Sequence, residues 1–247
     1  MLTFIFQPPL QPMNYDQVFE ALEQFGSEQT RKVLRRHGAK APFFGVKVQD
    51  LKKIQKKIKR NHSLALDLYA SGNSDAMYLA GLIAEPQKMS REQLQQWAEQ
   101  AYWYMLSEYC VAPVTSASPF AMELAEEWIE AQKEHLQAAG WTTYANYLSF
   151  QADSEIDLDR VQELIQLAEQ RVHLKDNRAA YAMNNFVIAA GTFCAPLFDT
   201  ALKVGAQIGK VKVNMGETSC KVPEIVPYLL KVKARDKVGK KTKRPNG

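Results

Sequence analysis

The sequence predicts an all-α fold, and three observations support this prediction. Apolar residues recur at helical spacing in nearly every segment between residues 15 and 207. These segments are about 10–18 residues long and are separated by Pro, Gly or clusters of Ser, Asp and Asn, which end helices and begin new ones. No convincing alternation of apolar and polar residues, the pattern of a half-buried strand, precedes residue 209. With 247 residues, of which 46% are hydrophobic, the chain can bury a substantial core.

The expected helices are placed by their apolar faces and by their start and stop residues. The first covers 15–25, and after a break at 38–42 a Lys-rich helix covers 48–58. Ser63, and then Ser74 or Asp75, are expected to cap the next two helices, the second of which ends at Pro86. The later helices begin at the capping box 90–93 and at the Ser-Pro pair 118–119, then cover 134–148, 157–172, 177–192 and 196–207, and finish with one from Pro223 to near residue 232.

Pairs of these helices recur at intervals of about 35–45 residues, which favours a HEAT/armadillo-like helical repeat solenoid, an α–α superhelix. A compact helical bundle of another type is the alternative that this weak periodicity leaves open. We expect an N-terminal arm at 1–14, one helical repeat domain at 15–233 and a basic C-terminal tail at 234–247. The alternating run 210–214 is short and fits an extended segment or a hairpin arm.

The charge is strongly polarised along the chain. The net charge is only +4, yet residues 31–60 carry twelve Lys or Arg against one Asp, and residues 231–247 carry eight against one. The body between these two segments is acidic overall. Clustered Lys and Arg attract a polyanion, which is most often nucleic acid. The alternative for each cluster is a solvated helix face or a disordered tail.

Composition argues against several classes of protein. The three cysteines, Cys110, Cys194 and Cys220, are far apart and form no CxxC motif, so we expect a reducing cytoplasmic location without a disulfide framework or a metal site. No apolar stretch reaches the roughly 18–20 residues that span a membrane. No glycine-rich phosphate loop or nucleophile motif is present, and we expect no cofactor. We also expect a monomer.

The C-terminal third carries the most distinctive motifs. They read AMNNFVIAAG at 182–191, IGKVKVNMG at 208–216, CKVP at 220–223 and VGKK at 238–241. On these motifs the chain resembles the DNA alkylation repair (AlkD-like) family of HEAT-like repeat proteins. The resemblance extends upstream through Gly45-Val46, before the Lys-rich helix, and through Trp103, and it covers residues 15–244.

The resemblance implies a DNA glycosylase that excises N-alkylated purines while a basic concave face holds double-stranded DNA. Such chemistry needs a carboxylate and electron-rich aromatic rings near the developing cation. The family pattern places an Asp four residues after a mid-chain Trp. Here Trp103 is present, Ser107 stands where the Asp is expected, and Glu108 follows it, about 100° further round a helix. Trp103, Ser107 and Glu108 are therefore the catalytic candidates, although the expected Asp is replaced.

Two further family positions also differ. The second family Trp falls near 184–186, where Phe186 is the aromatic residue, and the Arg expected in the helix before it is absent from 136–139. Binding is therefore favoured over catalysis. The candidate DNA-binding residues are Lys52, Lys53, Lys56, Lys57, Lys59, Arg178, Asn184, Asn185, Lys240 and Lys241.

Each candidate also has a structural interpretation. Trp103 suits core packing as well as a cleft, and Glu108 suits an exposed acid. Arg178 either lines the concave face or pairs with Asp176 or another nearby acid, and Asn184 and Asn185 either contact a ligand or bond between helices. A different class of function, a non-catalytic helical-repeat scaffold for a protein partner, uses the same groove without nucleic acid. The salt dependence of DNA binding separates the two classes.

Overall fold

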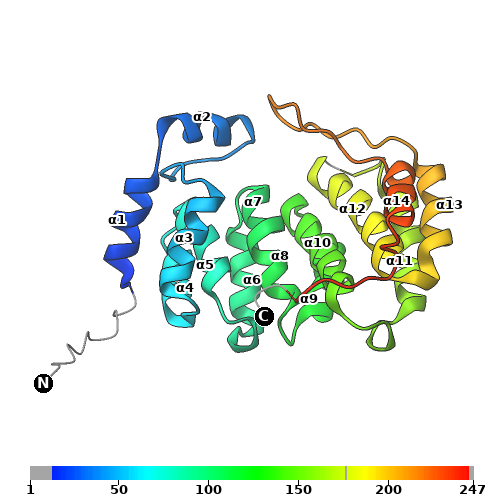
Figure 1. Cartoon of the computed structure of the whole chain (residues 1–247), viewed down its shortest axis with the longest axis horizontal. Helices are drawn as coiled ribbons and strands as arrows, with labels where there is room; N and C mark the ends of the chain where they lie inside the picture. The colour runs from blue at the N-terminus through cyan, green and yellow to red at the C-terminus, as the bar shows by residue number, and fades with distance from the viewer. Residues whose placement is uncertain (1–12, 176, 245–247) are drawn as a thin grey trace, which may run out of the picture.

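The computed structural model describes residues 13–175 and 177–244, and its helices stand side by side in chain order (Figure 1). No strand occurs in these ranges, which confirms the all-α prediction. The helices are α1 Tyr15–Phe25, α2 Glu28–Arg36, α3 Val48–Ile58, α4 His62–Ala70, α5 Ser74–Ile83, α6 Arg91–Gln100, α7 Tyr104–Leu106, α8 Ala112–Ser116, α9 Ala121–Ile129, α10 Glu134–Phe150, α11 Leu158–Arg171, α12 Asn177–Phe193, α13 Phe198–Ile208 and α14 Ile225–Ala234. Most of the expected arm, residues 1–12, lies outside the described ranges.

Side-chain caps begin several of these helices. Asn14 and Gln17 form a capping box at α1, and the predicted box at α6 is present between Ser90 and Gln93. Two other predicted caps were wrong. Asn61 rather than Ser63 caps α4, and Asn73 rather than Ser74 or Asp75 caps α5. In both cases an Asn just upstream already offers its side-chain oxygen to the first turn, so the helix begins earlier.

Two other local expectations also need correction. The Ser-Pro pair 118–119 does not start α9, because Ser118 bonds back to the Thr115 carbonyl and the helix begins at Ala121. The last helix begins at Ile225, two residues after Pro223. The run 210–214 forms no strand pair within the described ranges and is part of a long loop, 209–224, that crosses the top of the molecule towards α2 (Figure 1).

The core runs through the whole arc. Its N-terminal part is built from α1 to α8, and its C-terminal part from α10 to α14, with α9 and α10 contributing to both. The helix α10 packs against α8, α9 and α12. Trp128 of α9 and Trp141 of α10 are the largest fully buried side chains in the described ranges. Gly140 allows this close packing, because a Cβ there would lie 2.7 Å from the Ile129 nitrogen. The arc is therefore a stack of helices held by shared apolar layers.

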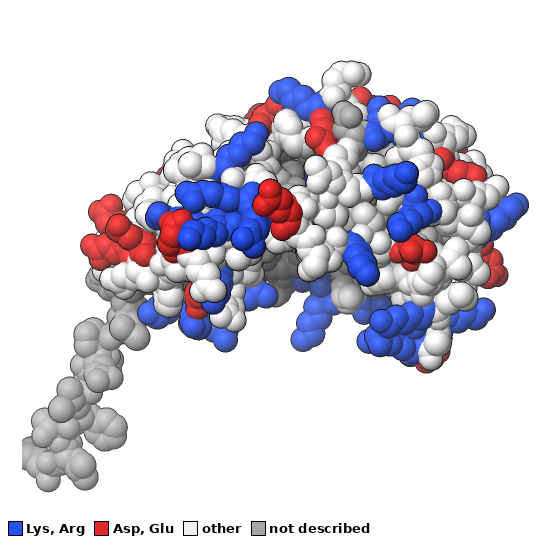
Figure 2. Space-filling model, turned by 90° about the horizontal axis from the view of Figure 1, so that it is seen from above, with Lys and Arg blue, Asp and Glu red and all other residues white. Residues whose placement is uncertain are grey.

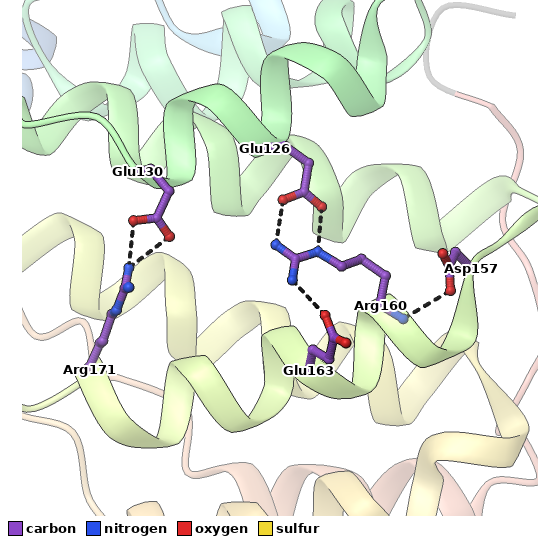
Figure 3. Close-up of polar contacts among 6 residues, drawn as sticks. All are labelled: Glu126, Glu130, Asp157, Arg160, Glu163 and Arg171. Carbon is purple, nitrogen blue, oxygen red and sulfur yellow. Dashed lines mark hydrogen bonds and ion pairs between the residues drawn. The ribbon is translucent and has the colours of Figure 1, made fainter.

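The outer helices are linked by exposed ion pairs. Arg160 of α11 donates two hydrogen bonds to Glu126 of α9, at 3.0 and 2.8 Å (Figure 3). At the other end of α11, Arg171 donates to Glu130, which lies one turn after Glu126 in the sequence. Arg91 of α6 reaches Glu123 and Glu127 of α9 in the same manner. The cations on this side of the arc are thus neutralised by acids of the neighbouring repeat.

No single described helix is long and apolar enough to cross a membrane. The segments 177–193 and 195–208 pass that test only together, and the break between them bends the pair by 118°.

Candidate nucleic-acid interface

A pocket of about 840 Å³ lies under the loop 209–224. Its floor is made by the residues before and within α7 and by the first turns of α12, and its roof by the end of α2 and by residues 214–221. The two halves of the roof meet where Gly216, at φ +71°, lies against the backbone of Arg36. A Cβ at this glycine would be 2.1 Å from the Arg36 carbonyl oxygen, so only glycine allows the approach.

Of the predicted catalytic residues, Trp103 lines the pocket, whereas Ser107 and Glu108 are buried and are not among its lining residues. Trp103 lines the pocket although it is mostly buried, and its indole Nε1 donates to the Ser74 hydroxyl at 2.8 Å. Trp103 therefore packs in the core and also borders the pocket, and its functional role there stays a prediction. Ser107 is buried below it, and its hydroxyl has no hydrogen-bond partner within the described ranges.

A distortion of the helix places Glu108. Between α7 and α8 the chain forms a π-helical turn, Ser107–Val111, in place of an α-helical one. A π turn holds more residues than an α turn and so changes the direction of the side chains that follow it. Glu108 is only 3% exposed, so it is not the surface acid that was one of its interpretations. It stays a predicted catalytic residue, and its contacts bear on that role.

Both carboxylate oxygens of Glu108 are bonded to Arg178. The distances are 2.7 Å from Nε to Oε1 and 2.5 Å from Nη2 to Oε2. The guanidinium also lies 4.2 Å from the ring centres of both Tyr104 and Tyr181, and Glu134 accepts a hydrogen bond from the Arg178 backbone. Burial raises the pKa of the Glu108 carboxyl, and the bonds from Arg178 oppose that rise. Arg178 thus pairs with a nearby acid, Glu108, while Asp176, the other acid considered as its partner, lies outside the described ranges.

This arrangement is a closed cation site. Electron-rich rings and a carboxylate are the groups that would stabilise a positively charged base. Here those groups already surround the guanidinium of Arg178, whose side chain is 14% exposed. The site therefore satisfies its own charge.

The lysines of α3 have a different environment. Lys52, Lys56, Lys57 and Lys59 are exposed, and none forms an ion pair within the described ranges. Lys53 pairs with Asp50 at 2.7 Å and lies over the Phe25 ring. Seen from above, Lys and Arg project on both sides of the hollowed lower edge of the molecule (Figure 2). The four lysines without an ion pair thus differ from the arginines of the outer helices, which are neutralised by acids.

The basic tail is bound to the body as far as it is described. The amides of Gly239 and Thr242 donate to the carbonyls of Thr192 and Ser149. Lys240 pairs with Asp236, and Lys241 bonds Asp153 at 2.7 Å. A smaller pocket of about 450 Å³ lies between α14 and the tail, and half of its lining residues are basic: Lys231, Arg235, Lys237, Lys240 and Lys241.

The two adjacent Asn residues of α12 lie in different environments. Asn184 is buried, and its amide donates to the Pro223 carbonyl at 3.0 Å. This hydrogen bond between two segments agrees with the structural interpretation of Asn184. Asn185 is partly exposed. Neither residue lines the 840 Å³ pocket.

Sequence reasoning missed several residues at this site. The exposed Tyr109, the ring of Tyr181 and Arg36, which forms no ion pair within the described ranges, all line the pocket, but none belongs to a recognisable motif. The basic run 31–36 was the one available signal, and it forms α2. Within the described ranges no group of three or more His, Cys, Asp or Glu is placed to hold a metal ion.

The stacked helices define a helical repeat protein, and its pocket is lined by both basic and aromatic side chains. The chain belongs to the DNA alkylation repair enzyme family, which it matches over residues 18–213. The solved structure to which it is similar is described as related to the HEAT-like repeat DNA glycosylases, in agreement with this assignment.

Two curated relatives come from Listeria. An uncharacterised protein of Listeria innocua serovar 6a is 33% identical over 229 residues, covering 90% of this chain and 99% of that protein. An uncharacterised protein of Listeria monocytogenes serovar 1/2a is 32% identical over 231 residues, covering 91% and 100%. A solved structure described as a new family of proteins related to the HEAT-like repeat DNA glycosylases, with affinity for branched DNA structures, has a TM-score of 0.87. It is 34% identical and covers 95% of this chain and 100% of its own, which confirms the predicted HEAT-like repeat fold.

Proposed function

We propose that this protein binds branched double-stranded DNA and that base excision is not its main activity. One observation carries the proposal: Lys52, Lys56, Lys57 and Lys59 are exposed and form no ion pair within the described ranges, whereas Arg91, Arg160 and Arg171 of the outer helices are neutralised by acids. Unpaired Lys side chains gain most from contact with phosphate, because no protein carboxylate has to be displaced. The preference for branched DNA is taken from the similar solved structure described above.

The proposed contacts are Lys52, Lys56, Lys57 and Lys59, with Lys53, Asn185, Lys240 and Lys241 as secondary contacts. Arg178 and Asn184 are not retained as phosphate contacts, because the guanidinium of Arg178 is held by Glu108 and the side chain of Asn184 is buried, with its amide nitrogen bonded to the Pro223 carbonyl. Excision is disfavoured because both oxygens of Glu108 are held by Arg178, and Ser107 offers no carboxylate.

The test compares a three-way junction with a linear duplex of the same total length, by fluorescence anisotropy at several salt concentrations. We expect tighter binding to the junction. Replacing Lys52, Lys56 and Lys57 together by Ala is expected to lower the slope of log K against log salt by about 0.9 for each phosphate that the variant no longer binds. The matched control replaces Lys88, Lys133 and Arg171, which pair with Glu85, Glu99 and Glu130, and is expected to leave the slope unchanged.

Equal slopes for the two triple variants would contradict the proposal and favour the protein-scaffold alternative. A methylated duplex incubated in parallel measures base release, and release that disappears in Glu108→Gln would instead favour the glycosylase. A monomeric state and a cytoplasmic location stay predictions. Sedimentation of the free protein tests the first of these.

A further inference from the structure

We infer that the 840 Å³ pocket takes one unpaired nucleotide of the branched DNA, with its base against tyrosine and its phosphate at the roof. This inference rests on the proposed function and specifies which part of the branch the protein reads. The pocket has the volume of a small-molecule site, which spans about 300–1,000 Å³.

The inner wall offers an aromatic surface for a base. Tyr109 follows Glu108 in the π-helical turn and is 46% exposed, so its ring is not used by the core. It lies edge-on to Tyr104, with ring centres 6.2 Å apart. Exposed aromatic rings bind unpaired bases by stacking, and they do so with little sequence preference.

The charge inside the pocket suits a neutral base. The guanidinium of Arg178 is neutralised by Glu108 and covers one face of both Tyr104 and Tyr181. A base entering the pocket would therefore meet aromatic surface and a compensated ion pair and would not meet a bare charge. Nothing in this wall favours a cationic base over a neutral one.

The roof provides the complementary anion contacts. Arg36 and Lys221 line it, are exposed, and form no ion pair within the described ranges, while Arg35 beside them is bonded to Glu28. The one acid among the lining residues described is Glu217. The cations at the mouth of the pocket suit the phosphate of a nucleotide, which stays in contact with water. The aromatic rings inside suit the base, which is removed from water when it enters the pocket.

The occupant is expected to be unpaired because a paired base must first leave its stack. That step costs least for a base without a partner, and branch points are where such bases occur. A free nucleotide has the same chemistry, so the experiment must distinguish it from DNA.

The experiment uses three-way junctions with 2-aminopurine at one unpaired branch nucleotide, and fully paired junctions for comparison. Tyr109→Ala is expected to weaken binding of the unpaired junction by about tenfold, to abolish its fluorescence change, and to leave the paired junction unaffected. Tyr109→Phe keeps the ring and is expected to behave as the wild type. Tyr15→Ala removes another exposed ring, on α1 and outside the pocket, as the control.

The outcomes separate the two claims. If the junctions bind but Tyr109→Ala and Tyr15→Ala behave alike, the nucleotide pocket is wrong and the proposed function stands. If no DNA binds, the proposed function itself fails. Labelling of the thiol of Cys220, which lines the pocket, provides the third arm. Protection by the unpaired junction supports the inference, whereas protection by dTMP alone, without protection by the junction, overturns the assignment to DNA.

Discussion

The Arg178 guanidinium and the Glu108 carboxylate, 70 positions apart in the sequence, form a two-bond ion pair that joins α12 to the π-helical turn. The pair lies between helices that belong to different parts of the arc, and it is shielded from water on the Glu108 side. Burying a charge is tolerated only when it is paired and bonded, and here both conditions are met. The pair therefore joins two parts of the structure, and one of its members, Glu108, is also the predicted catalytic carboxylate.

Removing one partner of this pair is expected to destabilise the protein strongly. Arg178→Met leaves Glu108 buried without a counter-charge, and the free energy of unfolding is expected to fall by about 3–5 kcal/mol. Adding Glu108→Leu should recover much of that loss, because the uncompensated charge is then gone. Urea unfolding of the single and double variants measures both, and equal stability of the two would contradict this account.

The exposed pair Arg160–Glu126 is expected to contribute far less. Arg160→Met breaks bonds of similar length, but the Arg side chain is 39% exposed, so water solvates both charges once they separate. We expect a change within about 1 kcal/mol in the same urea assay. A loss as large as that of Arg178→Met would show that the linked outer helices act as one cooperative network.

Asp75 organises the turn before α3. Its buried carboxylate accepts hydrogen bonds from the backbone nitrogens of Phe44, Gly45 and Val46, at 2.7, 2.9 and 3.3 Å. Asp75→Ala leaves three donors without a partner and is expected to cost about 3 kcal/mol or more. Asp50→Ala, which removes only an exposed pair with Lys53, should cost less than about 1 kcal/mol, and thermal unfolding compares the two.

The three cysteines are expected to differ in reactivity. Burial raises the pKa of the Cys110 thiol to about 12 and that of Cys194 to about 11, so neither forms much thiolate near neutral pH. Cys220 is exposed. A disulfide reagent at pH 8 should therefore modify one thiol in the native protein and three in denaturant. Rapid reaction of Cys110 in the native state would contradict its burial.

Two glycines with similar positive φ angles test the roof of the pocket. Gly209 and Gly216 both have positive φ, but only a side chain at Gly216 would collide with Arg36. Gly209→Ala is expected to cost about 1–2 kcal/mol from strain alone. Gly216→Ala should add faster amide hydrogen exchange across residues 214–221, because the loop must move off α2. Equal exchange in the two variants would show that the contact does not hold the loop.

The all-α fold could be predicted from the sequence because the apolar faces of helices such as α1 and α3, and the breaks between helices, are local signals. The site was only partly predictable. Trp103 and Glu108 could be chosen from the family pattern, but the π-helical turn and the partner of Arg178 depend on contacts between distant segments. Periodicity carries no information about such contacts, so the exposure of Tyr109 could not be foreseen either.

The contact between Gly216 and Arg36 also sets how the molecule can deform. A stack of helix pairs usually changes its curvature by adding small rotations between neighbours. Here the loop 209–224 ties one rim of the arc to α2, near its other end (Figure 1). The width of that rim is therefore set by a direct backbone contact. Bending of the arc must either break the contact between Gly216 and Arg36 or take place at the opposite rim. A rigid duplex would meet a frame of fixed span on one side and an adjustable edge on the other.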